Sequence, residues 1–150
     1  MVFTDVTADP IDPSEVLDRV SAHEDGAVLL FLGVVRNHAD GRPVDGMRYE
    51  AYDAMARGVL EEIAKEVSQR HGVQRIAVVH RVGELKLGEV SVAIAVSSPH
   101  RGEAYSANRE VIEEIKKRLP VWKKERYVDG DSAWVEGSVP PVPTGTEGAS

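Results

Sequence analysis

The sequence predicts an α+β fold with a mainly antiparallel sheet, two long helices and a C-terminal β-hairpin. Three observations lead to this prediction. Two long stretches repeat apolar residues at helical spacing, and they end before Gly72 and Pro120. Several shorter stretches alternate between apolar and polar residues, as half-buried strands do. Near the end of the chain, Asp129-Gly130 separates two strand-like segments and is typical of a hairpin turn.

The first part of the chain is expected to form a strand, a helix and a second strand. Residues 2–7 alternate loosely and predict an edge strand. Asp12 is a favoured N-cap residue and is followed by a proline, so a helix is expected to start here and to end near Gly26. The run 26–36 is the most apolar of the chain and predicts a central strand. Gly33 within it indicates a bulge or a close backbone approach.

The middle of the chain combines strands with the first long helix. Residues 44–52 alternate regularly and predict a half-buried strand, after which Asp53 is expected to cap a helix that ends before Gly72. Residues 74–82 and 89–98 predict two further strands. The second of these alternates between bulky and small side chains, and its small side would allow a helix to pack closely.

The next part is expected to form the second long helix and the hairpin. The helix is expected to run from Pro99 to about Leu119, because Pro120 cannot continue it. Residues 121–127 and 132–136 flank the turn and predict the two hairpin strands.

Length and composition predict one globular domain and a tail. The chain has 150 residues, of which 42% are hydrophobic and 29% charged, as in ordinary soluble proteins. The domain is expected to comprise residues 1–137, and residues 138–150, rich in proline, glycine, serine and threonine, to be disordered. No apolar run approaches the roughly 20 residues that span a bilayer, and the N-terminus lacks signal-peptide features. A cytoplasmic protein without a membrane partner is expected.

Charge and residue usage exclude several classes of function. The net charge of −7 argues against a nucleic-acid partner, which requires a broad basic surface. The absence of cysteine excludes disulfides, thiolate metal sites and a cysteine nucleophile. The five histidines show no spacing typical of a metal site, so we expect none. If the protein handles sulfur, the sulfur must arrive on another molecule.

The segment 116–126 is a dense basic stretch in an otherwise acidic chain. It holds six cations and one acid, whereas the rest of the chain has 12 basic and 24 acidic residues. Such a stretch favours a small anionic ligand. The break at Pro120 places Lys116 in the last helical turn, where we expect partial burial, and Lys123 on a strand, so both can point into one pocket. Alternatively, these cations offset the helix dipole and are solvated.

Two other groups of positive charge have two interpretations each. Arg36 follows the most apolar run and is either a solvated strand exit or a ligand contact. His100 and Arg101 lie at a helix start, where backbone N–H groups bind anions, or they are merely solvated there. These residues alone leave both questions open.

Taken together, these motifs resemble the catalytic (large) subunit of molybdopterin synthase. They occur in the order and spacing of that family and cover about residues 26–136. The segments that carry the resemblance are FLGVVRNH at 31–38, YEAY at 49–52, HRVGEL at 80–85 with Gly88-Glu89, SSPHR at 97–101, and the basic stretch from Lys116 to Glu125.

The resemblance implies a fold, partners and a reaction. The fold is of the α/β-hammerhead type, and two large subunits form a homodimer that binds two small ubiquitin-like subunits, giving a heterotetramer. Each small subunit ends in Gly-Gly with a terminal thiocarboxylate. Its sulfur is transferred to cyclic pyranopterin monophosphate, and two transfers form the dithiolene of molybdopterin. No cofactor is implied, and the missing cysteine is explained because sulfur arrives on the partner.

The resemblance also assigns roles to residues. Lys116 would polarise the thiocarboxylate carbonyl and stabilise the developing charge. Lys123 would act as a general acid or base or hold the pterin intermediate, and burial beside other cations should lower a lysine pKa. The other matches would contact substrate: Arg36, His100 and Arg101 at the cyclic phosphate, Val34 and Val35 through backbone, and Lys124 and Glu125 at the rim.

One alternative belongs to another class of function. The chain could be a non-catalytic dimeric scaffold that binds a Gly-Gly-tailed partner or a phosphorylated small molecule. A single-strand RNA binder fits poorly, because only 5% of the residues are aromatic.

Overall fold

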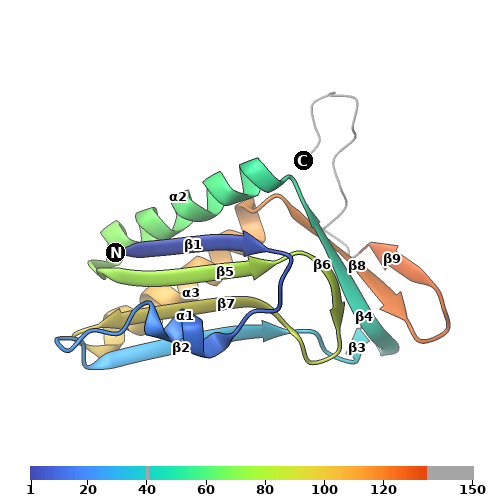
Figure 1. Cartoon of the computed structure of the whole chain (residues 1–150), viewed down its shortest axis with the longest axis horizontal. Helices are drawn as coiled ribbons and strands as arrows, with labels where there is room; N and C mark the ends of the chain where they lie inside the picture. Colours follow the sequence, from blue (N-terminus) through green and yellow to red (C-terminus); the bar gives the residue numbers. More distant parts are fainter. Residues whose placement is uncertain (40, 135–150) are drawn as a thin grey trace.

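The computed structural model describes residues 1–39 and 41–134 and has the predicted α+β architecture (Figure 1). Its strands form two sheets, and its three helices flank the four-stranded one. The expected domain boundary at residue 137 and the tail at 138–150 lie outside the described residues. None of the described helices is long and apolar enough to cross a membrane.

The four-stranded sheet has the order β1-β5-β7-β2. Its strands are β1 (Val2–Thr7), β5 (Arg75–Arg81), β7 (Val90–Ser98) and β2 (Ala27–Val34). The strand β1 lies at an edge, as predicted, and runs parallel to β5, whereas the other pairs are antiparallel. The prediction of a central position for β2 was wrong, because β2 forms the opposite edge and exposes Val28, Phe31 and Val34. An apolar run predicts a strand but does not specify which strands pair with it.

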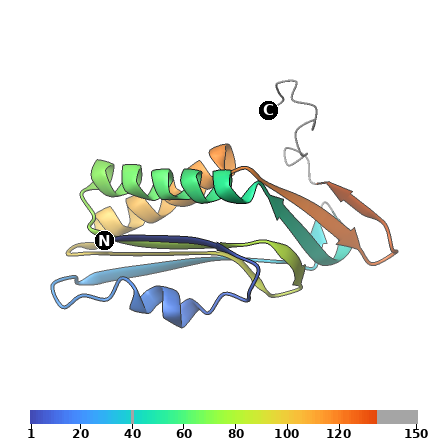
Figure 2. The same cartoon turned by 45° about the horizontal axis from the view of Figure 1, so that its top comes forward.

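Helices cover both faces of this sheet (Figure 2). The long helices α2 (Asp53–His71) and α3 (Arg101–Arg118) pack on the bulky side chains of β5 and β7, and the short helix α1 (Pro13–Asp18) packs on their alanines. This agrees with the bulky and small sides expected for residues 89–98.

Two helix termini differ from the predictions. The N-cap of α2 is Tyr52, and Asp53 instead lies in the first turn, where its carboxylate is 2.9 Å from Arg57. The first helix ends at Asp18 rather than near Gly26. The segment after it is a loop. Within this loop the Asp25 carboxylate accepts a hydrogen bond from Ser97 Oγ of β7 at 2.8 Å.

A second sheet extends from one end of the first (Figure 1). Its long strand β4 (Arg42–Ala51) pairs with β3 (His38–Ala39), β6 (Gly83–Lys86) and β8 (Val121–Tyr127), and β9 (Ser132–Trp134) pairs with β8. The pair β8–β9 is the predicted hairpin. Because β6 follows β5 and β8 follows α3, the two sheets meet where α3 ends.

Candidate active site

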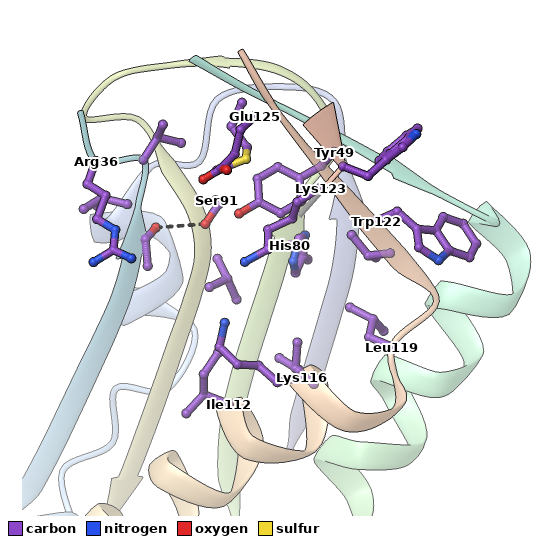
Figure 3. Close-up of a pocket in the computed structure, with 18 of the residues that line it drawn as sticks. Arg36, Tyr49, His80, Ser91, Ile112, Lys116, Leu119, Trp122, Lys123 and Glu125 are labelled. Carbon is purple, nitrogen blue, oxygen red and sulfur yellow. Dashed lines mark hydrogen bonds between the residues drawn. The ribbon is translucent and has the colours of Figure 1, made fainter. Parts of the chain in front are cut away.

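A cavity of about 940 Å³ lies where the C-terminal end of α3 meets the two sheets (Figure 3). Side chains from β2, β4, β5, β7, α3 and β8 line it. Of the residues assigned to the site, six line this cavity: Val34, Val35, Arg36, Lys116, Lys123 and Glu125.

A bulge in β2 places Arg36 at this cavity. The pairing of β2 with β7 shifts between Gly33 and Val34, as the glycine in this run had indicated. A Cβ at Gly33 would lie 2.8 Å from Val92 Cγ1, so only glycine permits this close approach. After the bulge, the backbone N–H of Val35 donates a hydrogen bond to the Glu89 carbonyl at 3.1 Å, so the chain stays beside β7 up to Arg36.

The break at Pro120 places both lysines at the cavity. Lys116 lies in the last turn of α3, and Leu119 after it is already extended, with φ −72° and ψ 125°. The chain then enters β8, where Lys123 pairs with Tyr49 of β4. In Figure 3 the two lysines reach the cavity from different elements, Lys116 from the helix and Lys123 from the strand. Lys123 is half-buried, but Lys116 is exposed rather than partly buried as expected.

Carboxylates pair with most of the other cations in the basic stretch. Arg118 is 2.8–3.1 Å from three glutamates of α2 and α3, namely Glu62, Glu66 and Glu114. Lys117 lies 3.6 Å from Glu114, and Arg126 is paired with Asp45 and Glu84. Within residues 1–39 and 41–134, Lys116, Lys123 and Arg36 form no ion pair. These three unpaired cations give the cavity a positive potential.

Burial and neighbouring charges lower the pKa of Lys123 below its ordinary value. Burial is the largest cause, followed by the positive charge of Lys116; Glu125 opposes the shift and Arg36 adds to it. This agrees with the lowered lysine pKa expected for the site. A lysine that loses its proton more readily is suited to proton transfer near neutral pH.

The floor of the cavity contains two buried polar rings. His80 of β5 is 5% exposed and Tyr49 of β4 is 8% exposed, and their rings meet edge to face with centroids 5.3 Å apart. Burial lowers the pKa of His80 to about 4; the Arg81 carbonyl opposes this shift, and the charges of Lys116 and Lys123 add to it. The motif at 80–85 begins with His80, but the sequence analysis gave this residue no part in the site. A polar residue near the end of an otherwise apolar strand was the signal that could have found it.

Comparison with known proteins identifies the family. The sequence model of the family described as MoaE protein matches residues 6–118. The chain belongs to the MoaE family. Two curated relatives, both named molybdopterin synthase catalytic subunit, come from Pyricularia oryzae and Bacillus subtilis. The first is 41% identical over 88% of this chain and 72% of its own length, and the second 40% identical over 87% and 83%.

Solved structures of MoaE-like proteins share the fold. Molybdopterin synthase from Staphylococcus aureus has a TM-score of 0.82 and 38% identity, covering 87% of this chain and 94% of that one. The molybdopterin biosynthesis MoaE protein from Burkholderia ambifaria has a TM-score of 0.74 and 31% identity, covering 93% and 92%.

Three assigned residues do not reach the cavity in this single MoaE chain. His100 and Arg101 lie at the start of α3, about 22–24 Å from Lys116 along the helix axis at 1.5 Å per residue. Lys124 projects from β8 on the face opposite Lys123, with its Nζ 5.5 Å from the centroid of the Trp134 ring. Their roles in binding substrate stay predictions. Among the described residues, no cluster of histidine and acidic side chains is suited to hold a metal ion.

Proposed function

We propose that this chain catalyses the sulfur transfer of molybdopterin synthase. The donor is the C-terminal thiocarboxylate of a small ubiquitin-like subunit, and the acceptor is cyclic pyranopterin monophosphate. The observation that supports the proposal is the convergence of Lys116, Lys123 and Arg36, none of them ion-paired within the described part of the chain, on one cavity of a MoaE family member. Both substrates are anionic, which matches the charge of this cavity.

The two lysines are suited to different steps. Lys116 is exposed at the cavity, so it can meet the incoming thiocarboxylate, polarise its carbonyl and stabilise the charge that develops as sulfur leaves for the pterin. Lys123 is half-buried with a lowered pKa, which suits a group that accepts and returns a proton. Arg36 can bind phosphate oxygens through two parallel N–H groups.

A single-turnover assay tests this function. The chain is mixed with the thiocarboxylated small subunit and cyclic pyranopterin monophosphate, and dithiolene product is followed. We expect product from the wild type and a loss of about 100-fold or more in Lys116→Ala and Lys123→Ala, with binding of the small subunit unchanged. Lys65→Ala is the matched control, because Lys65 is paired with Glu61 on the surface of α2. A stable complex that forms no product would leave the non-catalytic scaffold as the better interpretation.

We also propose that the site is completed by a second copy of the chain. The strand β2 begins beside Ser98, because Ala27 pairs with that residue, and it ends at the cavity. Among the described residues no strand pairs with the outer edge of β2, and Val28, Phe31 and Val34 of this strand are exposed. Antiparallel pairing of two β2 edges would place the start of one strand beside the end of the other. The partner subunit's His100 and the partner subunit's Arg101 would then lie near Arg36.

Mixed dimers test this arrangement. We expect Lys116→Ala and His100→Ala each to be inactive alone and to regain one intact site per dimer when the two chains are produced together. If both residues served the same chain, mixed dimers would contain no intact site and would stay inactive. With two small subunits, the dimer would form the proposed heterotetramer. The expected cytoplasmic location stays a prediction.

A further inference from the structure

His80 is a buried ionisable side chain at the cavity that the proposed mechanism does not use. Its Nδ1 lies 2.9 Å from the carbonyl oxygen of Arg81. A carbonyl can only accept a hydrogen bond, so Nδ1 carries the proton. The low pKa keeps the ring neutral near pH 7, and Nε2 is therefore left as an acceptor without a proton.

The ring is held in a fixed orientation. The ring of Tyr49 packs against it edge to face, and Tyr49 is in turn hydrogen-bonded to Ser91, whose hydroxyl donates to the Gly33 carbonyl at 3.2 Å. The charged groups that act on His80 are Lys116 from α3 and Lys123 from β8, and both line the same cavity. Figure 3 shows His80 at the same cavity as Lys116 and Lys123.

A neutral acceptor has a particular use at this position. The carboxylates that pair with Lys117, Arg118 and Arg126 cancel their charge. An imidazole can hold an ammonium group by a hydrogen bond and leave its positive charge available to an anionic substrate.

We propose that His80 is a positioning residue whose Nε2 accepts a hydrogen bond from a lysine ammonium group of the site and directs it at the reacting thiocarboxylate. The inference rests on the proposed sulfur transfer. It adds a third side chain to Lys116 and Lys123, and it gives a use to a buried, neutral histidine at the cavity.

Two variants separate positioning from packing. His80→Phe keeps a ring against Tyr49 but removes the acceptor, whereas His80→Gln keeps an acceptor and loses the ring. We expect single-turnover rates to fall by about 100-fold in His80→Phe, with binding of both substrates unchanged, and to be largely restored in His80→Gln. The opposite order, with His80→Phe active and His80→Gln impaired, would mean that the ring only packs, and would overturn the inference.

Which ring nitrogen of His80 carries the proton can be measured without catalysis. In the 15N spectrum of the histidine ring, we expect a protonated Nδ1 and an unprotonated Nε2 in the folded wild type at neutral pH. An Nε2-protonated or doubly protonated ring would contradict the inference. If the wild type forms no product, the proposed function fails, whereas an active wild type with an unaffected His80→Phe variant rejects only the role of His80.

Discussion

Lys123 lies directly opposite Tyr49 in the ladder between β8 and β4, so their side chains stand on the same face of the second sheet. Tyr49 contacts His80 of the first sheet. The ladder therefore places a lysine above the floor of the cavity, at the place where the two sheets meet. Lys116 reaches the same cavity from the end of α3. The distance between Lys116 and Lys123 therefore depends on the break at Pro120 that separates α3 from β8.

The charge of Lys116 is expected to be measurable at Lys123. Its removal in Lys116→Ala should raise the pKa of Lys123, because one of the charges that disfavour a second ammonium group is lost. Glu125→Gln should have the opposite effect, since Glu125 favours the charged form. A pH titration of 13C-labelled lysine side chains measures both changes, with Lys65→Ala as control. An unaltered pKa in Lys116→Ala would show that the two ammonium groups do not interact.

Burial of His80 is expected to make stability depend on pH. The pKa of His80 lies at about 4 in the folded chain and near 6.5 when unfolded, so between these values the unfolded chain binds more protons. The free energy of unfolding should therefore fall as the pH decreases from about 6.5 to 4, by at most about 1.4 kcal/mol per pH unit. Urea denaturation at several pH values measures this slope. The slope should be smaller in His80→Phe, and equal slopes in the two proteins would contradict this origin.

Gly33 is expected to be irreplaceable at the bulge of β2. A Cβ there would lie 2.8 Å from Val92 Cγ1, so Gly33→Ala should lower the free energy of unfolding by about 1–3 kcal/mol and displace Arg36 from the cavity. Gly58→Ala is the control: no described residue comes within 4 Å of a Cβ at this position inside α2, and the change should stabilise the helix by about 0.5–1 kcal/mol. Thermal and urea denaturation distinguish the two. A Gly33→Ala variant as stable as the wild type would refute the tight contact.

Arg118 is expected to connect the two long helices. Arg118→Ala leaves three glutamates of α2 and α3 without their shared cation and should lower the free energy of unfolding by about 1 kcal/mol. Arg109→Ala is the matched control on the same helix, because the side chain of Arg109 is 80% exposed and, among the described residues, pairs only with Glu113. Its effect should stay within about 0.5 kcal/mol. Equal effects in urea denaturation would mean that the glutamate cluster adds no stability.

Much of this protein follows from local patterns in its sequence. The alternation in residues 89–98, the stop at Gly72 and the break at Pro120 depend on near neighbours, so β7, both long helices and the hairpin were predictable. The family was recognisable because its motifs stand in order along the chain, and these motifs include both lysines.

Other features exist only after the chain has folded. The edge position of β2 depends on which strands pair, and the end of α1 on contacts of Asp25 with residues far along the chain. The basic stretch has six cations in sequence, but glutamates and aspartates from distant elements neutralise several of them and leave Lys116 and Lys123 at the cavity. Local patterns in the sequence predicted which charged residues to expect at the site. Which of these cations remain unpaired within the described part of the chain follows from folding, because ion pairs and burial depend on residues that are distant in sequence.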